Sequence, residues 1–411
     1  MKIPRQTLRL CLLLLPVWLA GGAEIGRFVW LNSIPGPYER NGLVKGRDFV
    51  QFYVIGTLAR EGAWEDMYDV ARLERAAARI VPPAAGEVPV PVYGPQVALF
   101  LAPLTKLPYL DARWLWLASS IVFYLLASWL VIQEATALRR HRPLTWITLT
   151  SSPLLAVLLA VGQTSAFGVL AWAAAAAALS RSRFLLFGMC VGLLAYKPPL
   201  LFGPTLALLV LGQWRALAGI GICAAGQLVS SVVAAGIGPW QRHIEALSAT
   251  SEYYHLTDTL PHQKHSLLGF FRLLLGGGPA AQVLTVIAAL GLLWLWWHHR
   301  QQRLTVWFVP FLIGTSVLLS PHLYVYDLAL LTPALLITAG ALARRCETTW
   351  EHAAAWTGYA LLYAPFSGPL AQQTRIQLST ILLVMFVIAV HHLWSASPSA
   401  SDQERAVLDR R

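Results

Sequence analysis

Apolar runs of roughly the same length recur from one end of this chain to the other, and they restrict its fold more than any other feature. A run of about 20 residues spans the hydrocarbon core of a bilayer when it is helical. That core holds no water to bond the backbone, so each run must satisfy its own amides, as an α-helix does. Only 12% of the 411 residues are charged, against about a quarter in soluble domains. The sequence therefore predicts an all-α polytopic membrane protein.

The apolar runs are sufficient for about twelve membrane spans. Two of them, 184–197 and 198–211, are short, so they either cross separately or form a broken pair. We expect one integral-membrane domain over 1–394 and a disordered cytoplasmic tail at 395–411. The spans are placed near residues 10–31, 113–134, 144–161, 164–179, 184–197, 198–211, 216–237, 280–297, 304–320, 323–343, 353–366 and 376–394.

The net charge of +11 is distributed as a membrane topology requires. Lys and Arg stand in short clusters between the apolar runs, and all these clusters fall on one side of the predicted bundle. Such an excess marks cytoplasmic loops, where it contacts anionic headgroups, and we infer no nucleic-acid partner. We expect a multi-pass protein of the inner (plasma) membrane, with segments 32–111 and 238–278 outside. The clusters are Lys2/Arg5/Arg9, Arg139/Arg140/Arg142, Arg181/Arg183, Arg215, Arg300/Arg303, Arg344/Arg345 and Arg405/Arg410/Arg411.

The N-terminus has two interpretations. Basic residues at 2–9, an apolar stretch at 10–20 and the small residues 21–23 resemble a secretory signal peptide. Apolar character resumes at Ile25 and continues to Leu31, which favours an uncleaved signal-anchor. With either interpretation, the segment that follows is delivered outside.

The first external segment has enough pattern to fold. An apolar stripe over 49–60 predicts a helix lying on the membrane surface. Residues 69–80 are also helix-forming, 81–95 is rich in proline and extended, and 97–101 is an apolar stub that dips into the interface. Such a cap over a helical bundle can enclose a reaction chamber.

The second external loop contains several histidines and acids but no regular metal-ligand spacing. His262 and His265 lie one helical turn apart, and no third ligand accompanies them. The four cysteines lie in apolar runs or at the cytoplasmic edge and are interpreted as packing residues. We assign no metal and no cofactor, and leave a requirement for a divalent ion open.

Four short motifs stand out by their order and by their placement at the ends of spans. They are Gly46-Arg47-Asp48-Phe49 with Tyr53; Val92-Tyr93-Gly94-Pro95 with Leu101-Ala102-Pro103-Leu104; Gly162-Gln163 with Lys197-Pro198; and Ser320-Pro321-His322-Leu323-Tyr324. Together they resemble glycosyltransferase family 87, polyprenyl-phosphate-sugar-dependent enzymes of the GT-C membrane class. Two positions depart from the family's pattern. Gly94 replaces a proline and Thr164 follows Gln163, which bears on sugar or acceptor preference.

The resemblance implies a GT-C-like bundle that takes a sugar of mannose or arabinose type from a polyprenyl-phosphate donor. The acceptor is a lipid or glycan on the external face, and Asp48 matches the family's proposed acid, the general base of an inverting transfer. Independently, such a transfer builds positive charge on the sugar and negative charge on the departing phosphate. A base at the acceptor hydroxyl and cations at the phosphate serve both.

Asp48 has a second interpretation, since Asp48-x-x-Gln51 also fits a helix N-cap. A carboxylate committed to backbone amides has a lowered pKa and is a poorer base. We assign the donor phosphate to Lys197, His322 and Arg47. A lysine in an apolar region is usually functional, although it can also snorkel to water. His322 and Arg47 fit equally well as ordinary interfacial residues.

Five residues are candidates for substrate binding. Asp327 lies inside a span, where acids are functional candidates, or it pairs with Lys197 or caps a helix. Gln163 contacts the sugar or braces a hairpin between spans. Tyrosines, like the nearby Trp64, stack on sugars or form an interfacial aromatic belt. The five are Tyr53, Tyr93, Gln163, Tyr324 and Asp327.

The principal alternative is a transporter or flippase of lipid-linked or small polar substrates. That class favours internal repeats and polar residues at the membrane midplane. The chain has no evident repeat, and its notable polar residues gather at the external edge. A non-catalytic scaffold of an envelope complex is a third possibility, which would leave Lys197 and the folded external segment unexplained.

Overall fold

The structure is a computed structural model, and it describes residues 5–84, 93–257, 260–300, 304–343 and 346–396. Helices and short 3-10 turns form the regular structure of these residues, together with two isolated β-bridges. The predicted all-α class is confirmed. The tail from 397 and most of the proline-rich stretch, 85–92, lie outside the described residues.

Seven helical stretches of the described chain are long and apolar enough to cross a bilayer. They are α1 (Arg5–Asn32), α5 (Tyr109–Glu134), α7 with α8 (Arg142–Thr150, Pro153–Val161), α12 (Trp214–Ala235), α15 (Pro279–His298), η6 with α17 (Val325–Leu331, Thr332–Leu342) and α20 (Leu378–Ser395). Shorter helices fill the remaining predicted spans. These are α9 (Ser165–Ser180), α10 with η4 (Phe184–Gly192, Leu193–Tyr196), α11 (Pro199–Val210), α16 (Phe308–Leu319) and α18 (Thr349–Leu361).

Proline interrupts the helical runs at two places. Pro153 begins α8, and the Ser152 hydroxyl caps it by accepting from the Leu154 amide at 3.2 Å. Pro199 begins α11 directly after the break that holds Lys197. A helix as short as α11 is about 18 Å long, less than the ~30 Å core. This length favours the broken pair over two separate crossings.

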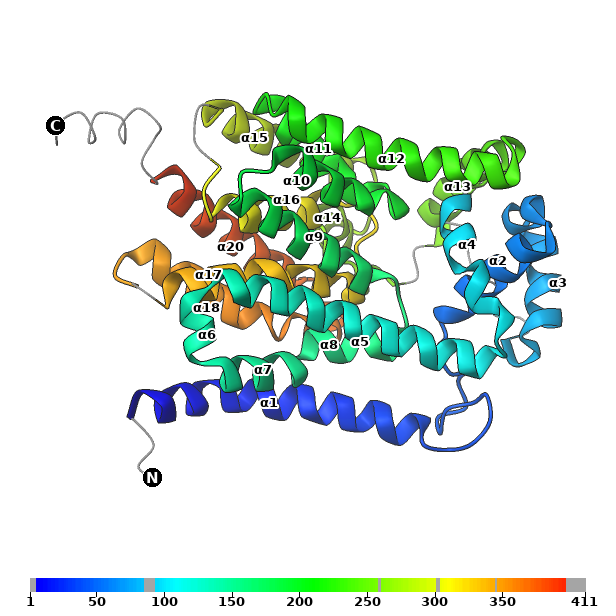
Figure 1. Cartoon of the computed structure of the whole chain (residues 1–411), viewed down its shortest axis with the longest axis horizontal. Coiled ribbons are helices and arrows are strands. Elements are labelled where there is room, and N and C mark those ends of the chain that lie inside the picture. The colour runs from blue at the N-terminus through cyan, green and yellow to red at the C-terminus, as the bar shows by residue number, and fades with distance from the viewer. Residues whose placement is uncertain (1–4, 85–92, 258–259, 301–303, 344–345, 397–411) are drawn as a thin grey trace.

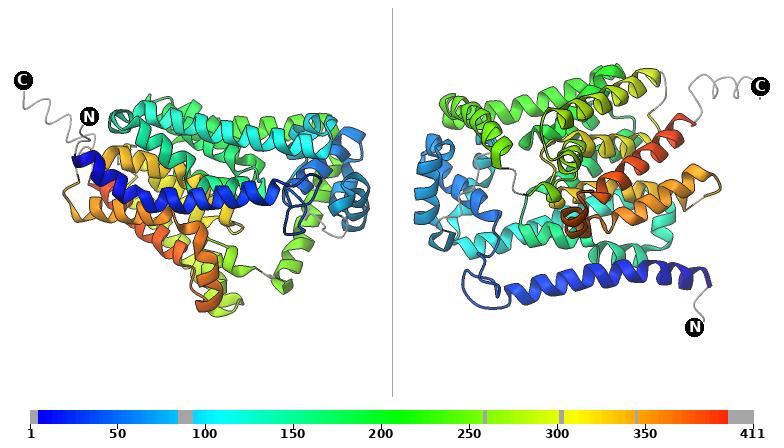
Figure 2. Two further views of the ribbon diagram at one scale, coloured as in Figure 1. Left: turned by 90° about the horizontal axis from the view of Figure 1, so that it is seen from below. Right: turned by 180° about the vertical axis from the view of Figure 1, so that it is seen from behind.

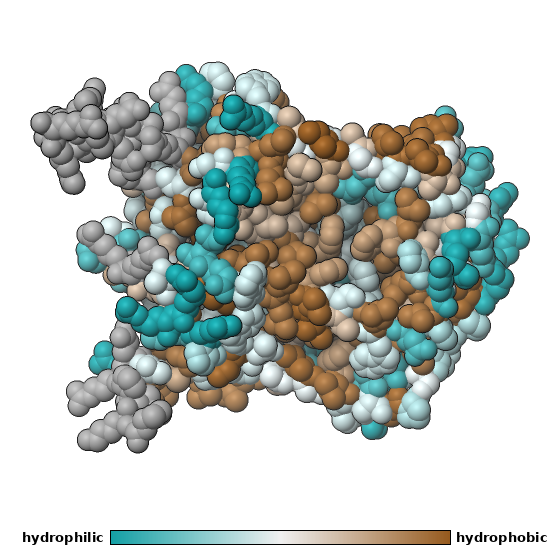
Figure 3. Space-filling view, viewed as in Figure 1, coloured by the Kyte–Doolittle hydropathy of each residue, from teal (hydrophilic) through white to brown (hydrophobic). Residues whose placement is uncertain are grey.

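The bundle has two polar ends with an apolar belt between them. One end carries α2 (Phe49–Glu61), α3 (Val70–Ile80) and α4 (Pro95–Leu101), whereas α1 begins and α20 ends at the other (Figure 1). The short helix α6 (Thr136–Arg140), which bears two of the clustered arginines, lies toward that second end. Hydrophobic side chains cover the middle of the molecule and hydrophilic ones gather toward both ends (Figure 3). The arrangement is that of a membrane protein.

The first segment predicted to be external, 32–111, folds into a compact cap in its described part, as predicted, but α2 lies inside it. Phe49, Val50 and every residue from Phe52 to Ala59 are buried, so the prediction of a helix on the membrane surface is wrong. Helices α3, α4 and α5 and the 3-10 turns η1 (Trp64–Tyr68) and η3 (Ala102–Lys106) pack around α2. The apolar stripe therefore meets protein on several sides instead of lipid. The 3-10 turn η2 (Pro82–Ala84) follows α3.

The second segment predicted to be external, 238–278, is largely helical in its described part. It contains α13 (Gly238–Thr257), η5 (Pro261–Gln263) and α14 (Leu267–Leu275). Helix α13 lies at the same end as the cap (Figure 2) and contacts η1, where the His243 ring packs against Tyr68 and Trp240. His265 is buried, with Nδ1 2.6 Å from the Ser379 hydroxyl. Helix α19 (Ser367–Thr374) packs against η5, and the turn η7 (Ala364–Phe366) directly precedes α19.

Helix α1 is continuous through the small residues 21–23 and packs against α8. A side chain at Gly21 would place its Cβ 1.8 Å from the Ser151 carbonyl oxygen, so only glycine permits this approach. The Trp18 indole also donates to the Thr148 hydroxyl at 2.9 Å. These contacts favour the signal-anchor interpretation.

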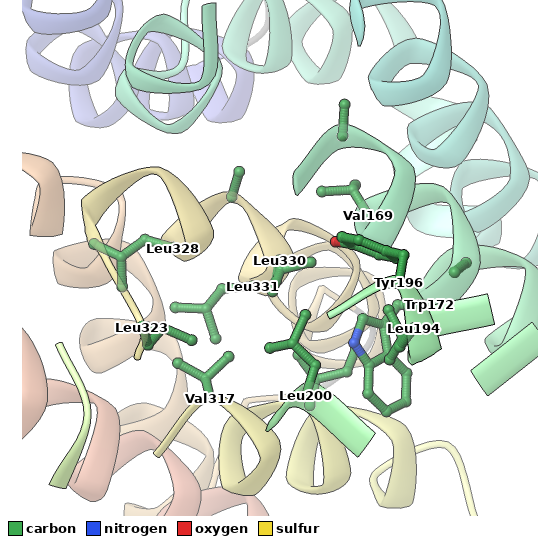
Figure 4. Close-up of a cluster of buried hydrophobic side chains, with 14 of the residues drawn as sticks. Val169, Trp172, Leu194, Tyr196, Leu200, Val317, Leu323, Leu328, Leu330 and Leu331 are labelled. Atoms are coloured by element: carbon green, nitrogen blue, oxygen red, sulfur yellow. The ribbon is translucent and has the colours of Figure 1, made fainter. Parts of the chain in front are cut away.

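A cluster of buried apolar side chains lies where α9, η4, α11, α16 and η6 meet (Figure 4). Trp172, Leu194, Leu200 and Leu330 are fully buried in it. The same turn, η6, carries Asp327, so a rigid apolar core supports that acid.

Candidate active site

Asp48 lies in a turn that α5 holds in place. The Tyr109 hydroxyl donates to the carbonyl oxygens of Lys45 and Gly46, at 2.6 and 3.2 Å. Gly46 has φ +70°, and a Cβ there would lie 2.8 Å from the buried Arg113 side chain. Arg113 in turn donates to the Asn32 side-chain oxygen at 2.6 Å. The turn therefore has a fixed shape, with glycine required at its tightest point.

The Asp48 carboxylate does not cap α2. Asp48 occupies the N-cap position with φ −79° and ψ −22°, and its side chain makes no capping hydrogen bond. The N-cap interpretation is thus wrong. A capping residue has extended backbone angles, whereas these angles are helical. The half-buried carboxylate turns instead toward the α8–α9 corner.

Gln163 holds this carboxylate through a chain of hydrogen bonds. Its Nε2 donates to Asp48 Oδ2 at 2.7 Å, and its Oε1 accepts from the Tyr93 hydroxyl at 3.1 Å. The preceding Gly162 ends α8 with φ +76°, and its carbonyl accepts from the Trp116 indole at 2.9 Å. The amide therefore has one orientation, with its nitrogen toward the acid.

Burial raises the pKa of Asp48 above its ordinary value of 3.8. The Gln163 hydrogen bond and the charges of Arg47 and Lys197 lower it in part, and the charge of Asp327 raises it. Burial also raises the pKa of Tyr93, so that its hydroxyl stays protonated and can donate. Asp48 is therefore a stronger base than an exposed aspartate would be.

A second cluster surrounds Asp327, which is fully buried. Its Oδ1 accepts from the Ser165 hydroxyl at 2.8 Å. Its Oδ2 pairs with the Lys197 ammonium and accepts from the Tyr324 amide, the latter at 3.2 Å. Asp327 thus pairs with Lys197 and caps a helical turn, which is the alternative to substrate binding that the sequence offered. Lys197 remains 11% exposed while Asp327 is 1% exposed, so the ammonium is the accessible member of the pair.

Two stacked tyrosines adjoin this ion pair. The Lys197 ammonium lies 5.4 Å from the centre of the Tyr326 ring, and the Tyr326 and Tyr324 rings stack with centres 5.8 Å apart. On the Tyr324 ring lies a second ammonium, Lys264, at 5.9 Å. Residues 264 and 324 form a β-bridge that brings the second external segment to the site.

Most of the predicted site residues are brought together. Asp48 accepts a hydrogen bond from Gln163, which in turn accepts one from Tyr93. The charges of Lys197 and Asp327 both act on the pKa of Asp48. Tyr324 joins them through its amide.

Three predicted residues are placed otherwise. Arg47 is exposed next to Asp48, and His322 is exposed in the turn before Tyr324. Tyr53 donates its hydroxyl to the Leu107 carbonyl at 2.7 Å and packs against Tyr109, so its contacts are with the cap.

Sequence reasoning missed Ser165, Tyr326 and Lys264. A polar residue two positions after Gln163, and an aromatic next to Asp327, are signals that could have identified the first two. Lys264 had no such signal, because only the β-bridge brings it to Tyr324.

Within the described residues, no three His, Cys, Asp or Glu side chains are grouped so as to hold a metal ion.

The family model of glycosyltransferase family 87 matches residues 92–321, more than half of the chain. The match includes Tyr93, Gln163 and Lys197 and excludes Asp48 and Asp327. No curated protein and no solved structure matches the chain. The apolar helices agree with the membrane location of such an enzyme. This chain belongs to glycosyltransferase family 87 and is a membrane glycosyltransferase.

Proposed function

We propose that this enzyme transfers a sugar from a polyprenyl-phosphate donor to a lipid or glycan acceptor at the external face of the membrane, with inversion. Asp48 is the general base. The single observation that carries this proposal is the Asp48 carboxylate, which does not cap α2, accepts a hydrogen bond from Gln163 and lies close enough to Lys197 for the lysine's charge to lower its pKa.

The proposed transfer needs no reactant besides the donor and the acceptor. Asp48 takes the proton of the acceptor hydroxyl as that oxygen bonds to the anomeric carbon. The bond between the anomeric carbon and the phosphate oxygen breaks, and its electron pair leaves with the polyprenyl phosphate. Attack opposite the leaving group inverts the anomeric centre.

Lys197 stabilises the departing phosphate in this proposal. An ammonium has three donors, and Asp327 accepts one of them. The remaining donors of Lys197 then bond the phosphate, while Asp327 holds the lysine in position. Arg47 and His322, both exposed near the cluster, are proposed to add charge and hydrogen bonds to the same phosphate.

The remaining polar groups are proposed to contact the sugar. Tyr324 and Tyr326 are half-buried and stacked next to Lys197, and we assign their rings to contact with the sugar. Tyr93 and Gln163 lie on the other side of Asp48. A prenyl chain is apolar, so a donor of this class reaches the site from within the bilayer.

Asp48→Asn tests the assignment with radiolabelled polyprenyl-phosphate-mannose and a panel of lipid and glycan acceptors. We expect turnover to fall by about 10²-fold or more, because the amide cannot accept the proton. The matched control is Asp69→Asn, an acid of the same cap that accepts from the Arg72 amide. Asparagine caps as well as aspartate there, so the control keeps its activity.

Wild-type turnover in Asp48→Asn would show that Asp48 is not the base. Transfer from a sugar nucleotide, with none from any polyprenyl phosphate, would overturn the donor class and leave the family assignment standing.

A further inference from the structure

A cavity of about 430 Å³ lies in the half of the bundle away from Asp48. It is enclosed by α1, α5, α6, α7, α8, α17 and α18. Its volume falls within the range of sites for small ligands, about 300–1,000 Å³. Nothing in the proposed transfer uses it.

The walls of this cavity are almost entirely apolar. Leu13 of α1, Leu144 of α7, Leu336 of α17 and Leu362, directly after α18, contribute to them. All these elements belong to predicted spans, so hydrocarbon is the surrounding medium. A hydrocarbon chain matches such walls, because it has no polar group that would need a partner there.

The margin of the cavity on α6 and α7 is strongly basic. Leu138 and His141 line the cavity, and Arg139, Arg140 and Arg142 flank them in sequence and are exposed. Basic clusters at the cytoplasmic end of membrane helices bind anionic headgroups. Apolar walls next to a triple-arginine corner match an amphipathic anion.

The acid of the facing helix is held by local hydrogen bonds. Cys346 and Ala354 line the cavity near the start of α18, and Glu351 lies between them in sequence. The Glu351 carboxylate accepts from the amides of Glu347 and Thr348, at 2.8 and 2.7 Å. It is engaged as a helix cap.

We propose that an anionic phospholipid of the leaflet on the arginine-rich side binds here, with one acyl chain in the cavity and its phosphate at the α6–α7 corner. The acyl chain would contact two elements, α8 and α17, that continue to residues of the proposed catalytic cluster. Ser152 and Thr332 line the cavity. Ser152 caps α8, which ends at Gly162 beside Gln163, and Thr332 directly follows the turn that carries Asp327.

Binding of phosphatidylglycerol to the full-length protein in detergent tests this site, with phosphatidylcholine of the same chains as the reference. Native mass spectrometry counts bound lipid, and thermal unfolding reports its effect. We expect preferential binding of phosphatidylglycerol, weakened by about tenfold or more in Arg140→Gln/Arg142→Gln. The matched control is Arg183→Gln/Arg215→Gln, the same charge change at exposed arginines whose neighbours in sequence do not line the cavity.

A second variant tests the chain separately. Ala339 lines the cavity with an exposed side chain, so Ala339→Phe fills space there without disturbing the core. It should abolish retention of phosphatidylglycerol.

Equal binding of both lipids by the wild type, or equal loss in the two arginine pairs, would overturn the headgroup site. Unchanged retention in Ala339→Phe, or equal stabilisation by glycerol phosphate alone, would overturn the acyl-chain site. None of these measurements involves sugar transfer, so they are independent of the proposed function.

Discussion

Asp48 lies close enough to Asp327 for the charge of Asp327 to raise its pKa, yet the surroundings of the two acids are opposite. Asp327 is fully buried and accepts from a hydroxyl, an ammonium and a backbone amide. Asp48 is half-buried, and within the described residues its side chain accepts one hydrogen bond, from Gln163. The contrast shows that a buried acid can serve two purposes. Saturated with donors it fixes a cation, and with few donors it remains able to take a proton.

The largest effect we expect is on stability at Asp327. Asp327→Asn leaves the Lys197 ammonium without its counter-charge in a buried site, which typically costs about 3–5 kcal/mol in the free energy of unfolding. Denaturant or thermal unfolding of the purified protein measures it. The double variant Lys197→Met/Asp327→Leu should recover much of the loss, because no charge is then left buried. If Asp327→Asn were as stable as the wild type, Asp327 would not have the structural role that distinguishes it from Asp48.

The isosteric change at Asp48 should not destabilise the protein. Since burial raises the pKa of Asp48, the folded protein binds that proton more tightly than the unfolded chain does. The stability contribution of Asp48 therefore falls as pH rises from 3.8 through the raised pKa. At neutral pH, Asp48→Asn removes this penalty, and its unfolding midpoint should equal or exceed that of the wild type. A clearly lower midpoint would give Asp48 the same structural role as Asp327.

The pH dependence of the rate tests whether Asp48 is the group that takes the proton. The base form of Asp48 is lost as pH falls through its raised pKa, so the acid limb of kcat/KM should lie above the 3.8 of an ordinary aspartate. Gln163→Met removes the hydrogen bond that most lowers this pKa, which should move the limb to higher pH. Asp69→Asn is the control, with an unmoved limb. A limb insensitive to Gln163→Met would mean that another group titrates.

The smallest effect is expected at Tyr93. Tyr93→Phe removes one neutral hydrogen bond to Gln163, worth about 0.5–1.5 kcal/mol. We expect kcat to fall about 2–10-fold, because the amide is less firmly oriented toward Asp48. Tyr53→Phe is the matched control, since its hydroxyl donates to the Leu107 carbonyl in the cap. An equal loss in both variants would indicate a general effect on the cap.

The spans could be predicted because their cause is local. A run of apolar residues must become a helix in lipid wherever it stands in the chain, and proline marks the breaks at Ser152 and Lys197. The surroundings of α2 could not be predicted in this way. Its apolar stripe fits lipid and protein equally well, and the packing of α3, α4 and α5 decided the matter.

The candidate site was predictable in part for the same reason. Asp48, Gln163 and Lys197 are polar residues at span ends, where position along the chain already limits them to one membrane face. Lys264 is 60 residues from Tyr324, and no spacing rule connects the two. Their contact follows from the β-bridge.

The amino-acid sequence alone was sufficient to predict that this chain spans a membrane, which ends of its spans are basic, and which polar residues lie at the ends of spans. These properties follow from the low solubility of charge and of unpaired amides in hydrocarbon, which acts on each segment separately. Which of the two aspartates accepts several hydrogen bonds, and which accepts one, depends on how distant segments pack together. Hydrogen bonds reach across about 3 Å, and the donors come from segments far apart in the chain.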